Sequence, residues 1–135
     1  MARVVTVLLG QPVLNEDGVA AEAITPGHLV AGVASLVKHA TANGPGRSYA
    51  LERDELGTGI TTAYAIADKV KVGAFPGGTR VYAHLASGEA ITVDDFLGSN
   101  GDGKLKAWAS GPYIARALET VTAINNSTRI RVEVN

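Results

Sequence analysis

Apolar and polar residues alternate along several short stretches of the chain, which is the two-residue period of a β-strand with one buried face. In residues 129–134, Arg129, Arg131 and Glu133 alternate with three aliphatic residues. Residues 69–74 follow the same rule, with two lysines facing outward and two valines facing inward. These stretches predict half-exposed antiparallel strands.

Residues 79–86 alternate in the same way after a Pro-Gly-Gly turn, with Val81, Ala83 and Leu85 facing inward and Arg80, Tyr82 and His84 facing outward. Gly and Pro interrupt the strands about every eight to twelve residues, which is typical of all-β folds. The pattern predicts a compact all-β barrel or sandwich of about ten short antiparallel strands, with little helix. Any helix is expected to be a single short turn, around residues 93–96.

The first strand, residues 3–9, is apolar on both faces and so must be covered on both sides. Either the rest of the domain or a neighbouring chain would cover it. Residues 11–18 contain Pro, Asn, Asp and Gly and are expected to form a loop. We therefore divide the chain into an N-terminal strand and loop, residues 1–19, and a single β domain, residues 20–135.

One pattern occurs twice without a gap, in residues 23–52 and 90–119. Three identities fall at the start, four in the middle and three at the end, ten of the thirty aligned positions. An internal period indicates that one supersecondary unit is used twice. The repeat predicts two related halves, arranged with pseudo-twofold symmetry around a shared core.

Apolar residues in 29–40 have the spacing of an amphipathic helix. The second copy argues against a helix, because residues 99–103, Ser-Asn-Gly-Asp-Gly, align with this region and have the chemistry of a hairpin turn. Related halves share a fold, so we expect strand, turn and strand in both copies.

The composition excludes several classes of function. The 135 residues contain 12 basic and 13 acidic side chains and no cysteine, so no electrostatic field would attract nucleic acid and no disulfide can form. No apolar run is long enough to span a membrane. We expect neither a nucleic-acid nor a membrane partner.

Candidate catalytic and metal-binding groups are sparse. His28, His39 and His84 lack the close spacing of zinc ligands, and His28, beside a glycine, is expected to be an exposed turn residue. The Asn-Gly-Asp-Gly turn fails as a calcium loop, because Lys104 stands where a ligand oxygen is needed. The carboxylate groups at residues 89–95 and 52–55 lie in segments expected to be exposed. We expect no catalytic residues, no metal and no cofactor.

Trp108 is the single tryptophan. It is either a core residue or an interface anchor, and a core of small side chains favours the second role. Together with the outer face of the first strand, the candidate interface residues are Arg3, Val5, Val7, Leu9 and Trp108.

Five blocks of sequence, in order, resemble the head decoration or cement proteins of tailed bacteriophages. They are residues 23–30 (AITPGHLV), 50–60 (ALERDELGTGI), 63–72 (AYAIADKVKV), 90–105 (AITVDDFLGSNGDGKL) and 128–134 (TRIRVEV). The likeness covers nearly everything from residue 20 onward. The repeated Ala-Ile-Thr element also resembles the start of β-clip domains.

The resemblance implies a structural, non-enzymatic virion protein, made in the host cytoplasm and bound to the outer capsid surface. It would act as a homotrimer at three-fold positions, where it would clamp neighbouring subunits of the major capsid protein. Two alternatives remain open. One is a β-clip module that binds or converts a small anion through groups such as His28, Arg47, Arg53 or His84, and the other is a tail or baseplate subunit.

Overall fold

Short β-strands provide all of the regular structure in this computed structural model, which describes residues 12–15, 18–52, 60–125 and 128–135. The strands are β1 (Val13–Asn15), β2 (Val19–Ala20), β3 (Val30–Ala31), β4 (Ser35–Lys38), β5 (Ser48–Ala50), β6 (Val72–Ala74), β7 (Arg80–His84), β8 (Ala90–Ile91), β9 (Phe96–Ser99), β10 (Leu105–Ala107), β11 (Ala115–Ala117), β12 (Val121–Thr122) and β13 (Arg129–Val134). The all-β prediction is confirmed. Within the described ranges there is no helix, and hence none that could cross a bilayer.

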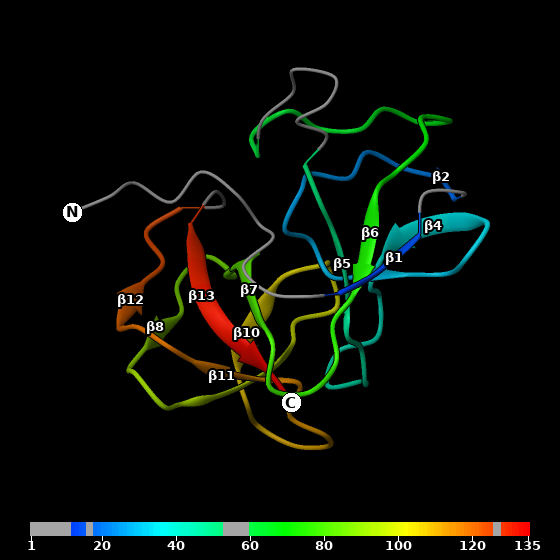
Figure 1. Cartoon of the computed structure of the whole chain (residues 1–135). Coiled ribbons are helices and arrows are strands. Elements are labelled where there is room, and N and C mark those ends of the chain that lie inside the picture. The colour runs from blue at the N-terminus through cyan, green and yellow to red at the C-terminus, as the bar shows by residue number, and fades with distance from the viewer. Residues whose placement is uncertain (1–11, 16–17, 53–59, 126–127) are drawn as a thin grey trace.

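The chain is built from two halves with the same strand order, which lie side by side in Figure 1. In the second half, five strands form one sheet in the order β10-β9-β11-β13-β7, and β8 and β12 pair separately. In the first half, β1-β6-β5 form one sheet, and a bridge between Leu29 and Tyr49 joins β5 to the β3-β4 pair. Thus β4, β3, β5, β6 and β1 correspond to β10, β9, β11, β13 and β7. The structural repeat is therefore longer than the sequence repeat, because it includes β1, β6, β7 and β13.

Both copies of the repeat form a hairpin, as the second copy predicted. β3 pairs with β4 and β9 pairs with β10, each antiparallel. In the second hairpin Gly101 and Gly103 both have positive φ, at 90° and 81°. This is the conformation that the Asn-Gly-Asp-Gly sequence favours. In the first hairpin Val33 is 74% exposed and Leu36 is fully buried.

A tight turn precedes each hairpin, at residues 25–28 and 92–95. In each turn the fourth backbone N–H donates to the carbonyl of the first residue, Thr25 or Thr92. The third residue has positive φ, and its N–H donates to the carbonyl of an equivalent alanine in the two copies, Ala50 at the end of β5 or Ala117 at the end of β11. The helical turn expected at residues 93–96 is therefore wrong. Its place is taken by a β-turn with Asp94 at φ 74°.

The halves share a core, as expected. The larger buried cluster combines Leu29, Tyr49 and Leu51 of the first half with Leu97 and Leu105 of the second. A smaller cluster belongs to the first half alone and contains Ala20, Ile24, Val30, Leu36, Ala50, Tyr64, Val70 and Val72. Burying each large aliphatic side chain stabilises the fold by about 1.5–3 kcal/mol, so the shared cluster binds the two halves to each other.

Two further expectations need correction. Residues 11–18 were expected to be a loop, but Val13–Asn15 pair with β6 as the edge strand β1. His28 and His84 were expected to be exposed and outward-facing, but their side chains are only 8% and 5% exposed. The expected strand at residues 3–9 lies outside the described residues, so the division of the chain at residues 19 and 20 stays a prediction.

Candidate interaction surface

Three aromatic side chains gather on the surface beside the second hairpin, and we refer to Phe96, Trp108 and Tyr113 as the aromatic cluster. Phe96 and Trp108 are each 44% exposed. Tyr113 lies between them, with its ring centroid 4.3 Å from that of Phe96 and 6.0 Å from that of Trp108. The Trp108 ring meets both neighbours nearly at right angles. Such edge-to-face packing orders the rings without burying them.

The hairpin positions the aromatic cluster. Phe96 begins β9 and Trp108 follows β10, and the N–H of Trp108 donates to the carbonyl of Phe96 over 2.9 Å. The inward positions of the same strands hold the buried Leu97 and Leu105, so the alternation leaves Phe96 outside. The indole Nε1 donates to Gly111 O over 2.9 Å, which fixes the orientation of the tryptophan ring.

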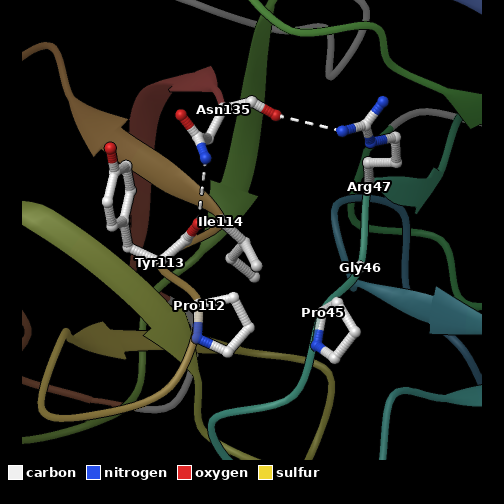
Figure 2. A pocket seen from close by; sticks show the side chains of 7 residues that line it. All are labelled: Pro45, Gly46, Arg47, Pro112, Tyr113, Ile114 and Asn135. Atoms are coloured by element: carbon white, nitrogen blue, oxygen red, sulfur yellow. Dashed lines mark hydrogen bonds between the residues drawn. The ribbon is translucent and has the colours of Figure 1, made fainter.

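A groove of about 320 Å³ lies beside the aromatic cluster and shares Tyr113 with it. The segments on its two sides are equivalent in the repeat, and Figure 2 shows Pro45 and Pro112 on opposite sides. Seven residues line it: Pro45, Gly46, Arg47, Pro112, Tyr113, Ile114 and Asn135.

The lining of the groove contains few ionisable groups. Arg47 is its one ionisable side chain besides Tyr113, and its Nη2 donates to Asn135 O at a long 3.5 Å. Asn135 Nδ2 donates to Tyr113 O over 3.3 Å. A nucleophile and base within hydrogen-bond reach would be needed for acid–base or covalent chemistry, and these lining residues offer no such pair.

The carboxylates considered as acid–base groups have structural partners instead. Asp95 Oδ2 accepts from Thr92 N within its own turn, and Glu89 Oε1 accepts from Ala107 N. Asp94 forms an ion pair with Arg116 that also involves Glu133. Glu52 is buried, and residues 53–59 are outside the described ranges. Across the part of the chain that the structure describes, no three His, Asp or Glu side chains converge as metal ligands.

The groups named for a small-anion site lie in different places where the structure describes them. His28 and His84 pack together in the interior, with ring centroids 4.4 Å apart. Arg47 is exposed and lines the groove, where neither histidine appears. Arg53 lies outside the described residues. The third histidine, His39, is buried and hydrogen-bonded through both ring nitrogens, to Ser99 and to Pro45 O.

Of the five predicted interface residues, the structure describes Trp108 alone, and it is a surface residue rather than a core residue. Arg3, Val5, Val7 and Leu9 lie outside the described residues. The sequence interpretation missed Phe96 and Tyr113. A signal was present, because Phe96 and Trp108 flank the Asn-Gly-Asp-Gly turn at positions that a hairpin brings together.

Among the comparisons with known proteins, only the comparison of folds found a similar protein. No family model matches the sequence, and no curated protein matches it. Among solved structures, the fold is similar to that of a phage structural protein. This is the head fiber gp8.5 N base of bacteriophage phi29, with a TM-score of 0.61, 14% sequence identity and coverage of 93% of each chain.

Proposed function

We propose that this chain is a structural protein of a tailed bacteriophage that binds the outer surface of the head and stabilises it by clamping neighbouring capsid subunits. The observation that carries the proposal is the similarity of fold, over 93% of both chains, to the base of a phage head fiber. The order of sequence blocks that resembles decoration proteins supports the same location. The partners would be the major capsid protein and further copies of the chain, in a trimer at three-fold positions, with no enzymatic role.

The aromatic cluster is the surface that we assign to capsid contact. Exposed Trp and Tyr side chains with fixed orientations are the residues that most often dominate binding energy at protein interfaces. The exposed Trp108 is held by the hydrogen bond of its indole to Gly111 O, and the half-buried Tyr113 packs its phenol ring against Phe96. The groove beside them offers a concave apolar border for a partner side chain.

Co-sedimentation with expanded phage heads tests the proposal. Loss of an interface tryptophan typically costs at least about 2 kcal/mol, so Trp108→Ala is expected to weaken head binding by about 30-fold. The matched control is Ile124→Ala, which removes another exposed apolar side chain, 83% exposed and outside the cluster. Light scattering of the protein with and without residues 1–10 tests whether the predicted strand holds a trimer.

Several outcomes would contradict the proposal. Wild-type protein that does not bind heads would rule it out, and electron microscopy of labelled particles would show whether the protein is on the tail instead. Equal binding by Trp108→Ala and the wild type would remove the aromatic cluster as the contact surface. A strict monomer that binds equally well after truncation would rule out the role of the N-terminal strand.

A further inference from the structure

His28 and His84 form a buried pair where the two halves of the chain meet. His28 ends the turn at residues 25–28 of the first half, and His84 ends β7 of the second half. Their ring centroids are 4.4 Å apart, with the planes tilted by 31°. Two hydrogen bonds tie the turn to β7 here, from His84 N to Gly27 O and between His84 Nε2 and Pro26 O.

Backbone partners hold His28 Nδ1 as an acceptor and His84 Nε2 as a donor. Thr25 N donates to His28 Nδ1 over 3.1 Å, so this nitrogen must carry a lone pair. His84 Nε2 lies 3.1 Å from Pro26 O and must donate to it. His84 Nδ1 is buried and has no partner among the described residues. A proton on His28 Nδ1 would face the Thr25 N–H, and a proton on His84 Nδ1 would be a buried donor without an acceptor.

The repeat shows that the His28 interaction is a structural one. In the equivalent turn of the second half, Asp95 Oδ2 accepts from Thr92 N over 2.9 Å, as His28 Nδ1 accepts from Thr25 N. An acceptor at this position therefore closes both turns. Aspartate accepts as an ion, whereas histidine accepts only while it is neutral.

The charged groups around the pair oppose protonation. Lys38 of β4, Lys104 before β10 and Arg129 of β13 all act on His28 as positive charges. Arg129 and Lys104 also act on His84. The negative or electron-rich groups Glu52 and Tyr82 act on Arg129, and the Arg129 guanidinium lies over the Tyr82 ring.

We propose that the histidine pair is an acid-sensitive latch between the two halves, closed while both rings are neutral and released when they take up protons. Protonation of His28 removes the acceptor that closes the turn. Protonation of His84 adds a second buried positive charge 4.4 Å from the first and next to Arg129. Packing of the turn against β7 is then destabilised, and the contact between the two halves weakens.

The electrostatics support this direction. Burial, with Lys38, Lys104 and Arg129, lowers the pKa of His28 from 6.5 to about 4. Burial, His28 and Arg129 lower the pKa of His84 to about 3. Because the folded pKa values are lower than the unfolded ones, the unfolded chain binds more protons between pH 6.5 and 4. The stability that the pair provides is complete above pH 6.5 and is lost as the pH falls toward 4.

The test is the pH dependence of urea unfolding of the full chain. With these pKa values, linkage predicts that the pair raises the unfolding equilibrium constant by about 50-fold from pH 6 to pH 5. His28→Asn retains an acceptor near the position of Nδ1, and His84→Gln retains a donor near the position of Nε2. Each variant leaves one titrating ring, so its unfolding equilibrium constant is expected to rise only about sevenfold from pH 6 to pH 5. The matched control Asp95→Asn, at the equivalent turn, is expected to leave the dependence between pH 6 and pH 5 unchanged.

A second measurement keeps the test decisive if a variant does not fold. Imidazole NMR signals of the folded wild type are expected to show His28 and His84 neutral at pH 5.5. Titration of either ring in the folded protein with a midpoint above pH 6 would overturn the proposal. So would a wild-type pH dependence that both histidine variants retain in full.

Discussion

The third position of the tight turns has positive φ in both copies, but the two copies place different residues there. The third turn residue must adopt positive φ, and it is Gly27 at 98° in the first copy and Asp94 at 74° in the second. Asp94 is exposed, and aspartate tolerates this region better than most residues. Gly27 has less room, because a Cβ there would clash with the end of the Arg129 side chain and lie 3.1 Å from the backbone oxygen of Tyr82.

Gly27→Ala is therefore expected to destabilise the protein by about 2–4 kcal/mol, from backbone strain together with the clash. Gly88→Ala is the matched control, since Gly88 has a similar φ of 88° and no atom within 4 Å of the added Cβ. The control should lose about 1 kcal/mol, the cost of the backbone conformation alone. Urea unfolding at pH 7.5 measures both, and equal losses would show that the space around Gly27 can adjust.

At the scale of elements, the two hairpins are held together by polar contacts that cross between the halves. His39, next to β4, lies 2.8 Å from the hydroxyl of Ser99 at the end of β9, and both side chains are buried. Backbone bonds run alongside, from Asn43 N to Ser99 O and from Gly103 N to His39 O. These contacts join the two hairpins into a connected unit.

Ser99→Ala should destabilise the fold by about 1–3 kcal/mol, because His39 Nδ1 loses its buried partner and Gly101 N loses an acceptor. The control is Ser110→Ala, at an exposed serine, where a change within about 0.5 kcal/mol is expected. Thermal unfolding of the two variants and the wild type measures these losses of stability. A Ser99→Ala variant as stable as the control would mean that water replaces the lost hydroxyl.

Much of the element structure follows from local sequence. The two-residue period located β7 and β13, and the turn chemistry of residues 99–103 identified a hairpin where the spacing in residues 29–40 resembles a helix. The period failed at His84, which stands at an outward position of β7. Its outer side is covered by the turn at residues 25–28, which comes from the other half. β1 was missed because three residues amid turn-forming ones carry no periodic signal.

At the scale of the whole molecule, the shared core makes the halves depend on each other. The second half buries Leu97, Leu105 and Ile130 against Leu29 and Tyr49 of the first half. No local pattern could predict which residues of one half cover the other. The aromatic cluster could likewise be predicted only in part from the sequence, because Tyr113 is brought to Phe96 and Trp108 by the path of residues 108–113.

Leu105→Ala should destabilise both halves together, by about 2–5 kcal/mol. We expect one urea transition with the same midpoint for Trp108 fluorescence, which reports on the second half, and for the amide NMR signals of Val70 and Val72 in the first. Val33→Ala, at a side chain that is 74% exposed, is the control and should leave the midpoint nearly unchanged. First-half signals that persist after the Trp108 transition would contradict a shared core.

The groove between the two repeat segments has a consequence for orientation. Its sides share a proline, Pro45 and Pro112, so a partner that recognised the common scaffold alone would have two equivalent ways to dock. The next two positions of the repeat differ. Gly46 is aligned with Tyr113, and Arg47 is aligned with Ile114. One side therefore presents a cation and the other an aromatic and an aliphatic side chain. A partner bound in the groove can therefore distinguish the two sides, and it would dock in one orientation rather than two.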